Sequence, residues 1–326
     1  MLLVTGGAGF IGSNLIAHLN ENGCNEIVVN DELGSSGKWR NLAKCRVVDI
    51  VPPGDLMRWL NSRKLEAVLH LGAISDTTAT DADLVIETNF RLSLKLLDWC
   101  CATGTRFIYA SSAATYGDGS SGFDDDWSPT ALQRLKPMNL YGFSKHLFDV
   151  AVVDRFARRS ELPPQWVGLK FFNVFGPNEY HKGEMMSLLA KRFDEARSGR
   201  PVRLFKSHRP GIGDGEQKRD FIYVDDAAAV TRWFLNRPSV SGIFNVGTGS
   251  ARSFRELITA MFDALGRPPH IDYVEMPEAI RDQYQYFTQA SVENLRRAGY
   301  NADFTALEDA VKQYVNRFLN TPDRYR

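Results

Sequence analysis

A glycine-rich loop near the start of the chain constrains the fold more than any other feature. Residues 7–12 read Gly-Ala-Gly-Phe-Ile-Gly, directly after Gly6, and they lie between the apolar run Leu2–Thr5 and the helical pattern Ser13–Asn20. A G-x-G-x-x-G turn between a strand and a helix lets the backbone approach a pyrophosphate, which then lies at the positive end of the helix. The loop therefore predicts a dinucleotide-binding unit, with contacts from Gly6, Gly7, Gly9, Phe10, Ile11 and Gly12.

The end of the second expected strand, Glu26–Asn30, bears on the choice of dinucleotide. Asp31 and Glu32 follow this strand about 20 residues after the glycine loop, where an acid holds the adenosine ribose. Two acids repel a ribose 2′-phosphate and favour NAD, whereas Lys38 and Arg40 in the following loop offer cations that pair with such a phosphate. The residues alone leave NAD and NADP equally open.

The first half of the chain alternates short apolar runs with amphipathic stretches. This pattern predicts βαβ units and a doubly wound α/β fold with a mostly parallel Rossmann sheet. The expected strands are Leu2–Thr5, Glu26–Asn30, Arg46–Asp49, Ala67–Leu71, Arg106–Ala110 and Trp166–Phe172. The clearest helical patterns between them are Asp83–Ala102 and Leu140–Arg159.

The pattern becomes less regular beyond Asn173. Helices are expected at Met185–Arg197 and Phe254–Leu265, a turn-rich segment covers His208–Glu216, and Ile243–Val246 is expected to rejoin the sheet. We therefore predict two interleaved domains. A dinucleotide-binding domain takes residues 1–172 with about 222–250 and 284–300, and a smaller α/β substrate domain takes about 173–221, 251–283 and 301–326.

Charge and length exclude several classes of protein. The chain has 326 residues with 39 Lys and Arg against 39 Asp and Glu, so its formal net charge is zero. A balanced charge argues against a nucleic-acid binder that depends on a strong positive field. The apolar runs are shorter than the roughly 18 residues that span a bilayer, and no basic region of a secretory signal precedes the first motif. We expect a cytoplasmic protein with no nucleic-acid or membrane partner.

Cysteine and histidine spacing argues against a metal site. The four cysteines form no C-x-x-C pair, and the six histidines form no H-E-x-x-H or similar ligand spacing. We therefore predict no metal and no disulfide framework. The acidic run Asp124–Asp126 lies in a Gly- and Ser-rich loop and is interpreted as a solvated turn.

A tyrosine and a lysine four residues apart are the strongest candidates for catalysis. Tyr141 and Lys145 share one face of an expected helix. A nearby cation favours the phenolate, so Lys145 is expected to lower the pKa of Tyr141 toward the working range of an acid or base. Ser112 follows the strand Arg106–Ala110, at the sheet edge where ligands bind in such folds, and its hydroxyl can bond the same substrate oxygen.

Together these motifs resemble the extended short-chain dehydrogenase/reductase superfamily and its NAD-dependent epimerase/dehydratase family. Within that family the chain is similar to the ADP-L-glycero-D-manno-heptose 6-epimerase group, from residue 1 to about 320. The similarity rests on residues 110–117, 139–145, 172–177, 181–183, 218–221 and 284–290. It implies epimerisation at C6 of ADP-D-glycero-β-D-manno-heptose through a 6-keto intermediate, which supplies heptose for the lipopolysaccharide inner core.

The resemblance also implies a role for each matching residue. Ser112, Tyr141 and Lys145 correspond to the hydride-transfer triad, and Lys182 corresponds to a second acid/base residue that also contacts the cofactor. The other implied cofactor contacts are Lys38, Leu71, Gly72, Ala73, Ile74, Ser75, Thr88, Asn89 and Val174. The implied substrate contacts are Ser112, Asn173, Glu184, Lys191, Phe205, Lys206, Ser207, His208, Arg219 and Tyr284. The resemblance favours NADP over NAD, tightly bound at one per subunit, and it implies a homo-oligomer, a pentamer.

Three departures from the family pattern concern specificity. Glu32 stands where the family has Asn after the acid, which weakens the case for NADP. Glu184 stands where the family has Ser after His-Lys-Gly, and the loop His208–Gly215 is longer than in the family. The main alternative is another nucleotide-sugar epimerase, such as a UDP-hexose 4-epimerase using NAD, which would need only Tyr141. A dehydratase would carry Asp-Glu in place of Ala113-Ala114. A non-catalytic dinucleotide-binding scaffold or sensor is the competing class.

Overall fold

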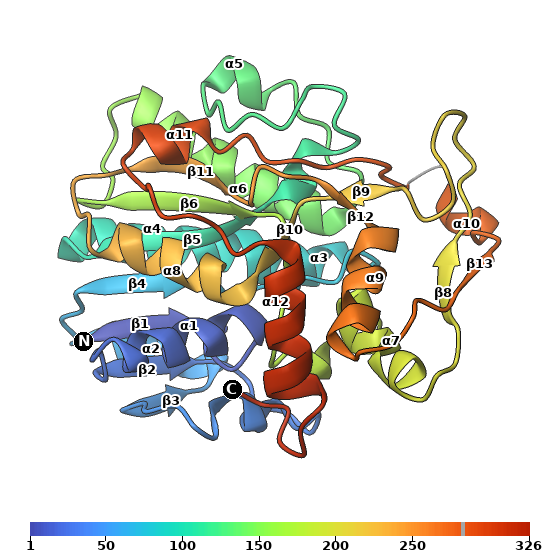
Figure 1. The fold of residues 1–326 in the computed structure, drawn as a ribbon. Helices are drawn as coiled ribbons and strands as arrows, with labels where there is room; N and C mark the ends of the chain where they lie inside the picture. Colours follow the sequence, from blue (N-terminus) through green and yellow to red (C-terminus); the bar gives the residue numbers. More distant parts are fainter. Residues whose placement is uncertain (282–283) are drawn as a thin grey trace.

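A seven-stranded parallel sheet forms the centre of the molecule (Figure 1). The computed structural model describes residues 1–281 and 284–326. The strand order is β11-β6-β5-β4-β1-β2-β3, and all six neighbouring pairs are parallel. The doubly wound α/β fold predicted from the sequence is therefore confirmed. The strands are β1 (Leu2–Thr5), β2 (Ile27–Asn30), β3 (Asp49–Val51), β4 (Ala67–His70), β5 (Arg106–Ser112), β6 (Trp166–Phe171) and β11 (Gly242–Val246).

Side chains that alternate along each strand build a core on both faces of the sheet. In β1, Leu2 and Val4 pack with one set of helices, while Leu3 points to the opposite set. Because both faces are covered, the strands are apolar throughout rather than alternating with polar residues. The first face carries α1 (Phe10–Glu21), α8 (Val224–Leu235) and α11 (Glu293–Arg297). The second face carries α2 (Leu56–Leu60), α4 (Leu92–Thr103) and α6 (Leu140–Ala157).

A second group of elements lies beyond the carboxyl ends of the strands (Figure 1). Three small two-stranded sheets pair β7 (Asn173–Phe175) with β10 (Phe221–Tyr223), β8 (Val202–Phe205) with β13 (Ile271–Val274), and β9 (Lys218–Arg219) with β12 (Arg252–Ser253). Buried side chains from the helices of this region form a separate apolar cluster that includes Phe193, Met261 and Val311. Those helices are α7 (Leu188–Arg197), α9 (Phe254–Ala264) and α12 (Leu307–Tyr314). The short helix α5 (Pro129–Leu132) contacts α6, and the short helix α10 (Glu278–Arg281) follows β13.

The predicted strand Arg46–Asp49 is displaced in the structure. The third strand runs from Asp49 to Val51, because Val51 is the residue that enters the core while Val48 remains 62% exposed. This strand lies at the edge of the sheet and pairs with β2 alone. The predicted return of Ile243–Val246 to the sheet is confirmed by β11.

The predicted helix Asp83–Ala102 is interrupted by a wider turn. Helix α3 (Ala82–Ile86) passes into a π-helical turn over Glu87–Arg91 before α4 continues. Such turns inside helices are frequent at functional sites. The turn contains Thr88 and Asn89, two of the residues expected near the cofactor.

The interpretation of Asp124–Asp126 as a solvated turn is wrong for its central residue. Asp125 is 3% exposed, and its carboxylate accepts hydrogen bonds from the Asn245 backbone at 2.9 Å and from the Asn294 side chain at 2.6 Å. Asp125 therefore joins the loop to β11 and α11. Within residues 1–281 and 284–326, no helix is both long and apolar enough to cross a membrane. The division into two domains stays a prediction, and its boundary at residue 283 lies outside the described residues.

Candidate active site

A large cleft with a volume of about 1270 Å³ lies at the carboxyl ends of the central strands. Parallel α/β sheets bind ligands in this position. Typical small-molecule pockets have volumes of about 300–1000 Å³, so this cleft is large enough for two ligands together. Residues from the strand ends line it, among them Thr5, Gly6, His70, Ser111, Ser112 and Phe171.

The glycine loop forms one wall of the cleft and fits a dinucleotide pyrophosphate. A Cβ atom at Gly12 would lie 2.2 Å from the carbonyl oxygen of Gly6, so this position tolerates only glycine. Gly6 itself has a φ of +65°, and a Cβ there would lie 2.6 Å from the Gly72 nitrogen. The loop ends at the first turn of α1, whose free N–H groups attract an anion. Gly6, Gly9, Phe10, Ile11 and Gly12 line the cleft.

Gly7 serves packing rather than lining the cleft. A Cβ atom at this position would lie 3.0–3.1 Å from the side chains of Val29 and Ile16. The absence of a side chain allows α1 to approach β2 closely, which is the helix-packing role that one glycine of such a loop serves.

An acid and a lysine lie together at the end of β2. The Asp31 carboxylate accepts hydrogen bonds from the Ala8 backbone at 2.8 Å and from the Lys38 ammonium at 2.6 Å. Asp31, Glu32 and Lys38 all line the cleft. This corner therefore offers an acceptor for ribose hydroxyls and a cation for a phosphate, and both nicotinamide dinucleotides match it.

The Ser-Tyr-Lys group is assembled by β5 and the first turns of α6. Asn139 caps this helix by accepting a hydrogen bond from the Gly142 N–H at 2.8 Å. A Cβ at Gly142 would lie 2.6 Å from the Ala114 oxygen, so glycine allows α6 to contact the turn that follows Ser112. Ser112, Tyr141 and Lys145 all line the cleft.

Burial controls the protonation of this group. It raises the pKa of Tyr141, and a hydrogen bond with Ser112 offsets part of the effect. The expectation that Lys145 lowers this pKa is therefore wrong for the protein by itself, since removal of the phenolate from water outweighs other contributions. Burial also lowers the pKa of Lys145 to about 8, although the nearby Asp149 carboxylate opposes the shift. Tyr141 is consequently a proton donor at neutral pH.

Lys182 reaches the same cleft from another part of the chain. It lies in the short 3₁₀ segment Tyr180–Met185 that follows β7, and its ammonium lies 5.2 Å from the centre of the Phe10 ring. Burial lowers the pKa of Lys182, while the Glu179 carboxylate opposes the shift. A neutral amine is therefore more accessible here than on an exposed lysine.

Asn89 supports the cleft from behind. Its amide accepts a hydrogen bond from the Ile74 N–H at 2.8 Å and donates one to the Ile74 oxygen at 2.9 Å. It also donates to the Ser144 hydroxyl on α6 at 2.9 Å. Asn89 is fully buried, whereas Leu71, Gly72, Ala73, Ile74, Ser75, Thr88, Asn173 and Val174 line the cleft directly.

The outer end of the cleft contains several of the residues expected near substrate. Lys191, Phe205 and Tyr284 line it. Arg219 lies behind them, 8% exposed, with its guanidinium 5.4 Å from the Tyr284 ring centre and 5.7 Å from that of Phe254. A buried guanidinium stacked on aromatic rings is suited to a diphosphate.

Besides Arg219, four other expected substrate residues are not among those that line the cleft. The Glu184 side chain is 98% exposed and lies 3.8 Å from Lys191. Lys206 and His208 pair with Glu275 at 2.9 and 3.3 Å, and Ser207 is held by Asp214. Short surface segments with many charges carry no periodic signal, so the sequence does not determine which way their side chains point.

The structure adds residues to the cleft that the sequence analysis did not select. His181 lines it beside Lys182, and burial lowers its pKa to about 4, so the ring is neutral at pH 7. His181 belongs to the His-Lys-Gly stretch already noted, which was the available signal. Met186, Arg192 and Glu275 also line the cleft, and they come from segments without a recognisable motif. No cluster of His, Cys, Asp and Glu able to hold a metal ion occurs in the described part of the chain.

Comparisons with known proteins agree with this geometry. A family model described as "NAD dependent epimerase/dehydratase family" matches residues 2–247. A protein of Nitratidesulfovibrio vulgaris strain Hildenborough named ADP-L-glycero-D-manno-heptose-6-epimerase is 50% identical over 327 residues, which cover 99% of each chain.

Solved structures are also similar over nearly the whole chain. The ADP-L-glycero-D-manno-heptose-6-epimerase of Helicobacter pylori has a TM-score of 0.78 and 30% identity, covering 97% of this chain and 95% of that one. The UDP-glucose 4-epimerase of Thermus thermophilus, in complex with NAD, has a TM-score of 0.74 and 26% identity, covering 97% of each chain.

Proposed function

Because the chain belongs to the NAD dependent epimerase/dehydratase family, we propose that it is an epimerase that inverts C6 of ADP-D-glycero-β-D-manno-heptose. The sugar assignment is supported by relatives of that name along the full length of the chain. The mechanism rests on one observation. Tyr141 and Lys182 line the same cleft, although one comes from α6 and the other from the segment after β7.

The resident cofactor in this proposal is a nicotinamide dinucleotide, and we favour NADP. Gly6, Gly9 and Gly12 would hold its pyrophosphate at the start of α1, and Asp31 and Lys38 would hold its adenosine ribose. NADP is favoured because the Lys38 ammonium already lies at this corner and can pair with a 2′-phosphate. A nicotinamide bound by these residues would supply reversible hydride transfer at the sugar carbon.

Inversion by this route requires two proton-transferring groups. The C6–H of a carbinol is not acidic, so the carbon must pass through a ketone before hydride returns to the opposite face. The C6 oxygen then needs a proton partner in each of two orientations of the sugar. We assign Lys182 to one orientation and Tyr141, supported by Ser112 and Lys145, to the other.

The directions of the pKa shifts indicate which of these groups accepts a proton and which donates one. Burial lowers the pKa of Lys182, so its neutral amine can take the C6 hydroxyl proton as the alcohol is oxidised. Burial raises the pKa of Tyr141, so its O–H can give a proton to the ketone oxygen as the C–H bond re-forms. In the reverse direction the roles exchange, and proton exchange with water restores both side chains.

The outer end of the cleft would bind the ADP moiety. Arg219 would face the diphosphate through the aromatic pocket that it shares with Tyr284. Asn173, Phe205 and Lys191 line the path between this pocket and the reacting carbon. The same family relationship is the basis for proposing a cytoplasmic homo-oligomer, a pentamer, whose product supplies the lipopolysaccharide inner core.

The test uses purified protein without added cofactor. It is incubated with ADP-D-glycero-β-D-manno-heptose while NMR follows the configuration at C6, and the bound dinucleotide is released and identified by mass. The proposal predicts a mixture of the two C6 epimers and released NADP. A Lys182→Met variant that retains full turnover would instead favour a UDP-hexose 4-epimerase, and absence of any epimerised heptose would refute the sugar assignment.

A further inference from the structure

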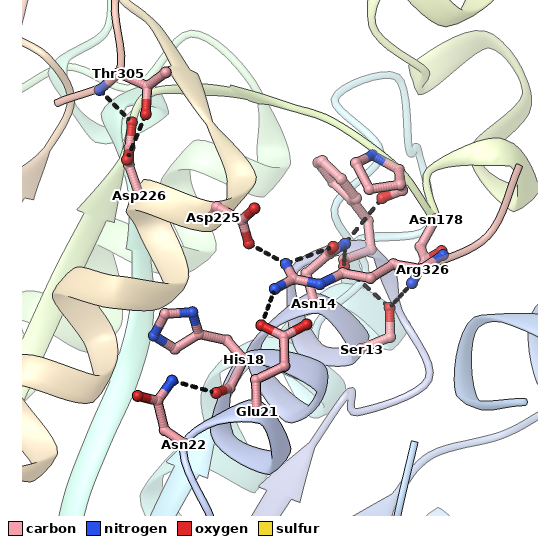
Figure 2. Close-up of polar contacts among 12 residues, drawn as sticks. Ser13, Asn14, His18, Glu21, Asn22, Asn178, Asp225, Asp226, Thr305 and Arg326 are labelled. Atoms are coloured by element: carbon pink, nitrogen blue, oxygen red, sulfur yellow. Dashed lines mark hydrogen bonds and ion pairs between the residues drawn. The ribbon is translucent and has the colours of Figure 1, made fainter. Parts of the chain in front are cut away.

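The segment Thr321–Arg326, here called the C-terminal strap, is held against the dinucleotide-binding side of the molecule (Figure 1). Figure 2 shows the Arg326 guanidinium between α8 and α1, where it pairs with Asp225 and with Glu21 at 2.8 Å. It also donates to the Asn14 side-chain oxygen at 3.4 Å. The Arg326 side chain is only 11% exposed, so these contacts are less screened by water than surface ion pairs.

Two further attachments fix the remainder of the strap. The Lys44 ammonium pairs with Asp323 at 2.7 Å and donates to the Tyr325 carbonyl oxygen at 2.6 Å. Arg324 pairs with Asp194 on α7 at 3.1 Å. The strap is therefore tied both to the dinucleotide-binding part of the chain and to the helix that borders the outer end of the cleft.

The strap contacts residues 177–186, the loop that carries Lys182. The Arg326 N–H donates to the Asn178 side-chain oxygen at 2.9 Å, and the Tyr180 hydroxyl donates to the Arg324 carbonyl oxygen at 2.9 Å. The rings of Tyr180 and Tyr325 meet edge to face with centres 5.3 Å apart. The next two residues after Tyr180 line the cleft, so the loop presents one side to the strap and the other to the ligands.

The opposite side of this loop is fixed by α1. Asn178 is fully buried with a φ of +72°, and its side chain donates to the Ser13 hydroxyl at 3.1 Å, as Figure 2 shows. Asn14 donates to the Pro177 carbonyl oxygen at 2.9 Å. A left-handed conformation is uncommon outside glycine and persists only where the surroundings enforce it. The loop is thus clamped between α1 and the strap.

We propose that the C-terminal strap is a positioning element for Lys182, acting through Asn178 and Tyr180. This inference rests on the proposed function in one respect, namely that Lys182 serves the C6 oxygen in one of the two sugar orientations. A proton-transferring group must lie within hydrogen-bonding distance of its target, and a displacement of about 1 Å costs on the order of 100-fold in rate. Loosening the strap should therefore impair the half-reaction of Lys182 and spare that of Tyr141.

Two variants loosen the strap at different points. Arg326→Ala removes the ion pairs with α1 and α8, and Tyr180→Phe removes the hydroxyl bond to the Arg324 carbonyl. The matched controls are Arg58→Ala, at an arginine whose side chain is 81% exposed, and Tyr300→Phe, at a tyrosine that packs on Trp233. Neither control position contacts the strap or lines the cleft in the described part of the chain.

The first measurement is hydrogen exchange of the purified variants, which needs no substrate. We expect at least 10-fold faster exchange in residues 177–186 of both strap variants. Exchange in α6 around Tyr141 should stay unchanged, as should exchange in both controls. Unchanged exchange in residues 177–186 would overturn the proposal, because the strap would then not brace the loop.

The second measurement mixes each C6 epimer of the ADP-heptose separately with the enzyme and follows transient reduction of the bound nicotinamide by its near-ultraviolet absorbance. Arg326→Ala should slow oxidation of one epimer by about 10- to 100-fold and leave the other within about twofold. Equal slowing of both epimers would indicate general destabilisation and overturn the positioning role. If the unaltered enzyme oxidises neither epimer, the proposed function fails, and the exchange result alone decides whether the strap braces the loop.

Discussion

A buried ion pair behind the active site gives the sharpest prediction about stability. Lys170 on β6 and Asp149 on α6 are 2% and 0% exposed, and their charged atoms are 3.4 Å apart. The Lys170 ammonium also donates to the Thr115 hydroxyl at 2.7 Å. The Asp149 carboxylate accepts hydrogen bonds from the hydroxyls of Tyr109 at 3.0 Å and Ser111 at 2.7 Å. Each charge therefore has the other as its buried ion-pair partner.

Replacement of one partner should cost far more than replacement of both. Lys170→Met leaves Asp149 with two hydroxyl donors but without its ion-pair partner, and breaking a buried pair in this way costs about 3–5 kcal/mol. Asp149→Asn should cost a similar amount, because it leaves the ammonium buried without its anion. The double variant removes both charges of this pair, and exchange of a buried pair for neutral groups is close to energetically neutral, so we expect a loss of about 1–2 kcal/mol.

Guanidinium unfolding of the four proteins, followed by tryptophan fluorescence, measures this cycle. The expected coupling free energy between Lys170 and Asp149 is at least about 3 kcal/mol, since the single losses sum to far more than the double loss. Single variants that each lose less than about 1 kcal/mol would show that the buried charges do not stabilise the fold as a pair. Additive effects in the double variant would do so as well, because they would mean that the two charges do not stabilise each other.

Three other predictions concern the cofactor, the substrate and pH. Gly12→Ala places a methyl group 2.2 Å from the Gly6 oxygen, so the purified variant should lack bound dinucleotide while its far-ultraviolet circular dichroism spectrum stays that of the unaltered protein. Arg219→Met should raise KM for the ADP-sugar by about 10- to 100-fold with the cofactor still bound, as steady-state kinetics would reveal. Burial lowers the pKa of His70 from 6.5 to about 3. Between these two pH values the unfolded chain binds more protons than the folded protein, so the free energy of unfolding falls as the pH falls. The decrease should be about 1.4 kcal/mol per pH unit below 6.5, and His70→Gln should flatten it in unfolding titrations.

The sequence predicts the sheet and the inner end of the site well because these depend on local patterns. The glycine loop, the Tyr141–Lys145 spacing and the strand before Ser112 all place their residues at the sheet edge. The outer end is predicted less well. Arg192 and Glu275 reach the cleft through packing between distant segments. Glu184 points to solvent although it lies only two residues after Lys182 along the chain.

The sequence also does not determine the pKa shifts of buried groups or which charged side chains are buried. The sequence places Lys145 one turn after Tyr141, which favours a lowered tyrosine pKa, but it does not give the depth of burial that raises it. Asp125 likewise lies in a polar stretch, yet its neighbours from β11 and α11 bury it. The depth of a side chain depends on contacts from far along the chain, and local composition does not encode them.

The central claim is that Tyr141 and Lys182 serve the same sugar oxygen in opposite orientations. Its most direct test measures transient reduction of the bound nicotinamide in Tyr141→Phe and Lys182→Met variants, with each C6 epimer of the ADP-heptose supplied separately. We expect complementary losses, in which each variant oxidises a different epimer at least about 100-fold more slowly and the other within about 10-fold of the unaltered enzyme. If both variants lose the same epimer, or if Lys182→Met oxidises both normally, the two-base account is contradicted.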